Sequence, residues 1–131
     1  MATPFVKWAG GKSKLAPKIE NRILNSIGFE NIKHYIEPFV GGGALFFYLA
    51  EKYRFESITI IDINIELINT YKAIKNSPYK LMDFLDKLQA QYNSLESEEE
   101  QSELYYEIRA QFNQLKDKNI LFNKVDYYRA A

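Results

Sequence analysis

The stretch Glu37-Pro38-Phe39-Val40-Gly41-Gly42-Gly43 decides the fold of this chain. Residues 34–40 are predicted to form a strand that runs into a turn at this stretch. Residues 44–53 follow, where Leu and Phe predict a helix. A β-branched run follows at residues 57–61, typical of a strand buried on both faces, and it ends at Asp62. Strand, loop, helix and strand in this order predict an α/β protein with a parallel sheet and right-handed crossovers.

The glycine loop lies where open parallel sheets usually bind ligands, at the carboxyl end of a strand. Glycines remove Cβ atoms, so a ligand can approach the backbone and N–H groups can point at it. Asp62 comes 21 residues after Gly41, a spacing at which an acid can accept hydrogen bonds from both ribose hydroxyls. These features predict a site for an adenosine-containing cofactor; the alternative is that the glycines serve only a tight turn.

The rest of the chain divides into two predicted regions, residues 1–77 and 78–131. The first holds an extended start and the α/β elements. Helices in this region are predicted from the apolar residues Leu15, Ile19 and Ile23, and from a later stripe, Leu67, Ile68, Tyr71 and Ile74, with Asn64 as its N-cap and Asn76-Ser77-Pro78 as its end. In the second region we expect helices around residues 81–92 and 104–115, and one beginning at 127–131. Two strands make a poor sheet, so the chain is interpreted as a fragment; the alternative is a complete small domain with unusual edges.

Composition limits the class of protein. The chain has 131 residues, of which 47% are hydrophobic and 26% charged, which predicts a globular protein without a membrane span. The absence of cysteine excludes disulfides, thiolate metal sites and a Cys nucleophile, and it fits a cytoplasmic protein. No metal site is predicted, and the single His34 is interpreted as a packing residue. Basic and acidic residues balance at 17 each, which argues against strong DNA binding by this chain alone.

Two features near the N-terminus could bind a ligand. Gly11-Lys12-Ser13 resembles the end of a phosphate-binding P-loop, which would make the chain a nucleotide triphosphatase fragment. That pattern needs a glycine where Val6 stands, so this alternative is disfavoured. Trp8, the only tryptophan, and Lys12 flank a Gly-Gly turn. A flat ring and an ammonium group on one loop can pack against a nucleoside and pair with a carboxylate.

Two stretches carry a specific resemblance, Phe5-Val6-Lys7-Trp8-Ala9-Gly10-Gly11-Lys12 and Glu37-Pro38-Phe39-Val40-Gly41-Gly42-Gly43-Ala44-Leu45-Phe46-Phe47. Together they resemble two signature motifs of the Dam and Dpn-type adenine-N6 DNA methyltransferases. Ile61-Asp62-Ile63-Asn64 resembles that family's next block, and weaker similarity continues to Tyr128-Arg129-Ala130-Ala131. The resemblance spans nearly the whole chain in the family's order.

This resemblance implies a partial Rossmann-like methyltransferase fold, S-adenosylmethionine as cofactor and adenine in duplex DNA as substrate. The cofactor-binding residues it implies are Trp8, Lys12, Glu37, Phe39, Gly41, Gly43 and Asp62, with Lys12 suited to the cofactor carboxylate and Asp62 to its ribose. It places Lys7 toward DNA and makes residues 78–131 the start of a helical DNA-recognition region. A cognate restriction endonuclease is an implied partner of the whole protein.

The family's catalytic motif, Asp-Pro-Pro-Tyr or a close variant, is missing. The chain has four prolines, and no two are adjacent. We therefore expect no catalytic residue in this sequence and no methylation of DNA by the isolated chain. Two alternatives stay open: a stand-alone S-adenosylmethionine-binding or regulatory module, and one half of a split enzyme completed by another polypeptide.

Overall fold

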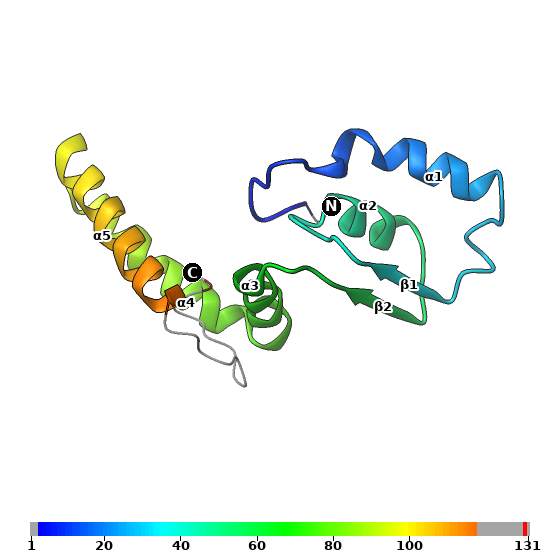
Figure 1. Ribbon diagram of the computed structural model, residues 1–131. Helices are drawn as coiled ribbons and strands as arrows, with labels where there is room; N and C mark the ends of the chain where they lie inside the picture. Colours follow the sequence, from blue (N-terminus) through cyan, green and yellow to red (C-terminus); the bar gives the residue numbers. More distant parts are fainter. Residues whose placement is uncertain (1–2, 118–129, 131) are drawn as a thin grey trace. The chain divides into compact units, whose positions relative to one another are not determined.

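The computed structural model describes residues 3–117 and residue 130 (Figure 1). In chain order the elements are a short 3-10 turn η1 (Lys12–Lys14), α1 (Ala16–Leu24), β1 (His34–Glu37), α2 (Ala44–Lys52), β2 (Ser57–Ile60), α3 (Ile65–Asn76), α4 (Pro78–Asn93) and α5 (Glu98–Asp117). Their contacts divide the chain into two compact units, Met1–Asn64 and Ile65–Ala131. The predicted domain boundary at residue 77 stays a prediction.

The first unit contains the parallel sheet that the sequence predicts. Strands β1 and β2 pair in parallel, in a register that runs from His34 opposite Ser57 to Glu37 opposite Ile60. Helix α2 connects them and therefore forms a β-α-β crossover. Within the described residues the sheet has two strands. The structure is thus a mixed helix and strand fold with a small parallel sheet, compatible with part of an α/β methyltransferase.

Helices α1 and α2 pack against each other on one side of the strands (Figure 1). The core beneath them consists of buried Ala16, Phe29, Leu45 and Leu49, with Ile19, Ile23, Ile32, Tyr35, Tyr48, Tyr53 and Phe55 packed around it. Phe29 and Tyr53 stack with their ring centroids 3.7 Å apart. Ile19 and Ile23 thus fall on the buried face of α1, as the sequence predicts, and Pro17 lies in its first turn. Leu15, the third residue of the predicted stripe, precedes α1 and is 52% exposed.

The prediction that the strand at residues 57–61 is buried on both faces is wrong for this chain. Side chains of Ile58 and Ile61 are 40% and 48% exposed, and Ile36 on the neighbouring strand is 62% exposed. The cause is that α1 and α2 cover only one side of the pair of strands. His34 is exposed as well, and its ring nitrogen Nδ1 lies 2.8 Å from the Ser57 hydroxyl oxygen, so it pairs across the strands instead of packing in the core.

The second unit is helical. Helix α3 begins directly after Asn64 and ends at Asn76, as predicted, and it packs against α4. The hydroxyl of Tyr92 in α4 donates a hydrogen bond of 2.9 Å to the side-chain oxygen of Gln101 in α5. The helix predicted at residues 127–131 lies outside the described residues apart from residue 130, which is helical. Across the described part of the chain, no helix has the length and apolar character needed to cross a membrane.

The glutamate run after residue 96 has a structural role that the sequence analysis did not assign. Glu98, Glu99 and Glu100 form the first turn of α5, where the helix dipole favours negative charge. Ser97 and Glu100 form a reciprocal cap. The backbone N–H of Glu100 donates to the Ser97 hydroxyl at 3.2 Å, and the Ser97 N–H donates to the Glu100 carboxylate at 3.1 Å. The hydrogen bonds that the Glu100 carboxylate accepts from the backbone N–H groups of Ser97 and Glu96 and from the Ser97 hydroxyl hold the pKa of Glu100 below its usual value.

Candidate functional site

The glycine loop leaves β1 after Glu37 and enters α2 at Ala44. Its path is anchored at Val40, which is 3% exposed and whose N–H donates a hydrogen bond of 3.0 Å to the carbonyl of Ile61. Gly41 and Gly43 have φ angles of +51° and +79°. Because L side chains rarely adopt these angles, the turn into α2 favours glycine at both positions.

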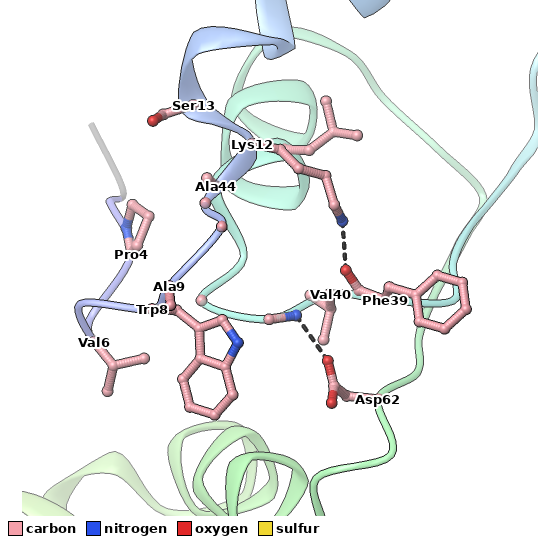
Figure 2. A pocket seen from close by; sticks show the side chains of 15 residues that line it. Pro4, Val6, Trp8, Ala9, Lys12, Ser13, Phe39, Val40, Ala44 and Asp62 are labelled. Carbon is pink, nitrogen blue, oxygen red and sulfur yellow. Dashed lines mark hydrogen bonds between the residues drawn. The ribbon is translucent and has the colours of Figure 1, made fainter.

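The indole of Trp8 lies directly against this loop (Figure 2). A Cβ atom added to Gly41 would lie 3.0 Å from the indole carbon Cδ1, and one added to Gly42 would lie 3.1 Å from the Cβ of Trp8. Larger residues in the loop would therefore displace the ring. Trp8 is nonetheless 42% exposed, so part of its surface stays available to a ligand.

Asp62, which follows β2, closes the other side of the loop. One carboxylate oxygen accepts the Gly41 N–H at 2.9 Å (Figure 2). The other accepts the Asn64 N–H, also at 2.9 Å. The glycine loop predicts N–H groups that face a ligand, but in the structure the Gly41 N–H faces Asp62. An ionised carboxylate has about four acceptor positions, so each oxygen of Asp62 can still accept another hydrogen bond.

Lys12 crosses to the loop from the opposite side. Its ammonium nitrogen Nζ lies 2.6 Å from Oε1 of Glu37 and also donates to the backbone carbonyl of Phe39. The Glu37 side chain is only 4% exposed, whereas that of Lys12 is 30% exposed. Oε2 of Glu37 accepts a hydrogen bond of 2.7 Å from the hydroxyl of Tyr35. Burial and this carboxylate raise the pKa of Tyr35 well above its usual value, so the hydroxyl stays protonated and donates.

Trp8, Lys12, Asp62 and part of the glycine loop border a cavity of about 360 Å³. Its lining comes from the N-terminal segment, the glycine loop, the start of α2 and the end of β2: Pro4, Val6, Trp8, Ala9, Gly10, Gly11, Lys12, Ser13, Phe39, Val40, Gly41, Gly42, Ala44, Leu45 and Asp62. All of these residues belong to the first compact unit. The cavity falls in the range of about 300–1,000 Å³ that is usual for small-molecule sites.

The structure brings together most of the residues that the sequence singled out. Five of them line this cavity: Trp8, Lys12, Phe39, Gly41 and Asp62. Glu37 is in contact with Lys12 but is not part of the lining, and Gly43 serves as the N-cap of α2. Lys7 is exposed and also lies outside the lining.

Sequence reasoning left several residues of this site out of its cofactor-binding set, among them Ser13, Gly42 and Tyr35. Ser13 and Gly42 line the cavity, and Tyr35 contacts Glu37. The signal for Tyr35 was present, because residues two apart on a strand share a face, which places its side chain beside that of Glu37.

A second carboxylate cluster lies outside the cavity and joins α1 to α2. Glu20 of α1 is 8% exposed and accepts hydrogen bonds of 2.5 Å from Tyr48 and 2.6 Å from Tyr53. Lys52 contacts both carboxylate oxygens, at 2.9 and 3.0 Å. These hydrogen bonds lower the pKa of Glu20 to about 2. We call this group of four residues the helix clamp.

The chemistry of the lining groups limits what the cavity can bind. It offers one ammonium group, one carboxylate, a flat indole surface and glycine backbone, which suit a ligand with an acid group, hydroxyls and an aromatic ring. In the described residues, no cluster of three or more acidic or histidine side chains could hold a metal ion. A glycine loop after one parallel strand and an acid after the next are typical of α/β proteins that bind their ligands at the carboxyl edge of the sheet.

Comparison with known proteins identifies the family within that class. Residues 8–130 match the family model of the D12 class N6 adenine-specific DNA methyltransferases. The match covers nearly the whole chain, and the chain belongs to this family.

Named relatives agree with this assignment. The chain is 47% identical over 116 residues to the Type II methyltransferase M.MjaIII of Methanocaldococcus jannaschii, a match covering 88% of this chain and 39% of that protein. It is 34% identical over 107 residues to the Type II methyltransferase M.CviBI of Paramecium bursaria Chlorella virus NC1A, a match covering 82% of this chain and 35% of that protein. It is 33% identical over 113 residues to the DNA adenine methylase of Vibrio cholerae, a match covering 86% of this chain and 35% of that protein. The chain thus spans less than two fifths of the length of each of these relatives.

Proposed function

We propose that this chain forms the S-adenosylmethionine-binding part of a site-specific DNA adenine-N6 methyltransferase. The observation that carries the proposal is that Trp8, Lys12 and Asp62, far apart in the sequence, line one cavity beside the glycine loop. Membership of the D12 class supports the methyl donor and the adenine substrate. The partial Rossmann-like fold is part of this proposal. It is supported by the β-α-β unit, in which β1 and β2 pair in parallel.

Three features of the cavity fit the cofactor. Each oxygen of Asp62 holds a backbone N–H and keeps an acceptor position, so the pair can receive the two ribose hydroxyls. Lys12 uses its ammonium group on Glu37 and Phe39, and its remaining N–H can bind the cofactor carboxylate. Gly41 lets the chain pass beneath the indole without a clashing Cβ. When bound, S-adenosylmethionine supplies a methyl group on a positively charged sulfur that an adenine amino nitrogen can attack.

The contribution to DNA binding is assigned to other residues. Exposed Lys7 adjoins Trp8 in the chain but does not line the cavity, so it is free to face the phosphates of a DNA duplex. Helices within residues 78–131 form the start of the recognition region in this proposal. Because two of the relatives are named Type II methyltransferases, we extend the proposal to a cognate restriction endonuclease as partner of the whole protein.

Transfer of the methyl group requires residues that this sequence does not contain. With no adjacent prolines, the chain has no Asp-Pro-Pro-Tyr motif to receive an extruded adenine. We therefore expect the 131-residue chain to bind cofactor weakly and to leave DNA unmethylated. Incorporation of labelled methyl groups into DNA adenine by this chain alone would contradict the proposal.

Binding of S-adenosylmethionine tests the proposal directly. Trp8 is the only tryptophan and lines the cavity, so its fluorescence reports occupancy, with calorimetry as a second readout. We expect Asp62→Ala to weaken binding about 30-fold, because hydrogen bonds to a charged group contribute about 2 kcal/mol. Asp83→Ala is the matched control, an exposed carboxylate on α4 paired with Lys87. Absence of binding, or equal affinity of the Asp62 variant and the unchanged chain, would overturn the proposal.

A stand-alone cofactor-binding module is the second candidate function. The observation that favours it is that every lining residue belongs to one compact unit of the chain. Tight binding of S-adenosylmethionine by the 131-residue chain would favour the module, whereas weak binding that strengthens when the rest of a methyltransferase is supplied would favour the enzyme.

A further inference from the structure

Tyr35 contacts Glu37 beside the candidate site and has no role in the proposed function. We propose that Tyr35 is a positioning residue: through Glu37 it directs the ammonium group of Lys12 to a ligand carboxylate. The inference rests on the proposed function, since it concerns the amino-acid part of the same cofactor. It predicts that Tyr35 governs affinity for ligands that carry a carboxylate and is indifferent to the nucleoside.

The geometry divides the two oxygens of Glu37 between two partners. Tyr35 and Glu37 are two residues apart on β1 and share a face of the sheet. The tyrosine hydroxyl lies 2.7 Å from Oε2, and the ammonium nitrogen of Lys12 lies 2.6 Å from Oε1. Each oxygen therefore has its own donor, and the donor on the Tyr35 side is neutral.

Burial makes this division necessary. The Glu37 side chain is 4% exposed, so water can do little to satisfy an oxygen that loses its partner. The Tyr35 ring stacks on Phe55 with centroids 5.4 Å apart, and this packing fixes the direction in which the hydroxyl points. Tyr35 thereby holds the carboxylate in one rotation, with Oε1 toward Lys12.

The consequence for Lys12 follows from its number of donors. An ammonium group has three N–H bonds, and Lys12 uses one on Oε1 of Glu37 and one on the Phe39 carbonyl. The third is available to a ligand in the cavity that Lys12 lines. Without the tyrosine hydroxyl, Lys12 would have to serve both oxygens of Glu37, and its last donor would turn away from the cavity.

Two ligands separate this role from a merely structural one. S-adenosylhomocysteine carries the cofactor's amino-acid group, whereas 5′-methylthioadenosine keeps the nucleoside and sulfur but has no carboxylate. Affinities of both for the full 131-residue chain would be measured by Trp8 fluorescence in the unchanged protein, in Tyr35→Phe and in a control. The control is Tyr53→Phe, which removes a similar hydroxyl, 2.6 Å from Glu20 in the helix clamp.

We expect Tyr35→Phe to lower the affinity for S-adenosylhomocysteine about tenfold and to leave the affinity for 5′-methylthioadenosine within about twofold. Tyr53→Phe should leave both affinities unchanged. In a Lys12→Met background, Tyr35→Phe should have no further effect on S-adenosylhomocysteine, because the group it positions is gone. An equal loss for both ligands would make Tyr35 a structural residue and overturn the inference, as would no loss for either ligand. Failure of the unchanged chain to bind either ligand would overturn the proposed function itself, and the inference with it.

Discussion

The helix clamp and the Lys12–Glu37 pair use the same side-chain chemistry for different purposes. In each, a buried glutamate accepts hydrogen bonds from tyrosine and binds a lysine. In the clamp, Lys52 contacts both oxygens of Glu20, so the group is satisfied within itself. At the loop, Lys12 contacts one oxygen of Glu37 and borders a cavity. The comparison teaches that the available lysine donor, and not the carboxylate, distinguishes a candidate binding group from a structural one.

The largest expected effect comes from removing the clamp carboxylate. Glu20→Ala eliminates hydrogen bonds from Tyr48, Tyr53 and Lys52 that tie α1 to α2, and it should lower the free energy of unfolding by about 3 kcal/mol. Denaturant unfolding followed by circular dichroism measures this. A loss below about 1 kcal/mol would show that the clamp is a surface cluster of little energetic weight.

The acid dependence of stability should follow from the same residue. The pKa of Glu20 is lowered from 4.5 to about 2 in the folded chain. A carboxyl group with a depressed folded pKa contributes its full stability above the unfolded value and loses it as the pH falls through the folded one. The difference in unfolding free energy between the unchanged chain and Glu20→Gln should therefore shrink from pH 4.5 to pH 2. A difference that stays constant across this window would contradict the assignment.

Replacing the two lysines should separate the two sites. Lys12→Met removes the cation of the cavity and should lower the affinity for S-adenosylhomocysteine about 30-fold, which corresponds to about 2 kcal/mol of binding free energy. Lys52→Met removes the equivalent cation of the clamp and should leave this affinity within about twofold. If both variants lost affinity equally, the helix clamp would also act on the ligand site, and the two lysines would not differ in function.

The smallest effect is expected at the glycines. Gly41→Ala and Gly10→Ala both place a side chain at a positive φ, +51° and +75°, and should each cost about 1 kcal/mol of stability. Only Gly41→Ala adds a contact, 3.0 Å from the indole, whereas a Cβ on Gly10 meets nothing within 4 Å. Trp8 fluorescence should therefore change in the first variant alone. Identical spectra would show that the ring does not rest on the loop.

Much of this fold could be predicted from local patterns. Helical periodicity located α1 through Ile19 and Ile23, and the proline at residue 78 marked the end of α3, because both signals act within a few residues. The burial of β2 could not be predicted. Ile58 is apolar enough for a strand covered on both faces, but its exposure depends on which other elements pack there.

The candidate site shows the same limit. The glycine loop and Asp62 could be identified because an acid at this spacing from a glycine loop can accept hydrogen bonds from ribose hydroxyls. The sequence did not show that the Gly41 N–H would bind Asp62, since this requires the ends of two strands to meet in space. Nor did the sequence show that Lys12, unlike the other lysines, pairs with Glu37, because the two residues are 25 positions apart along the chain.

The confinement of the cavity to residues between Pro4 and Asp62 has a consequence for synthesis of the protein. Chains emerge from the ribosome amino terminus first, and compact units fold as they emerge. The loop, the indole and the acid all precede α3, so the lining that the structure describes comes from the part of the chain that is synthesised first. This part of the candidate site can therefore assemble during translation, before the helices that follow it exist.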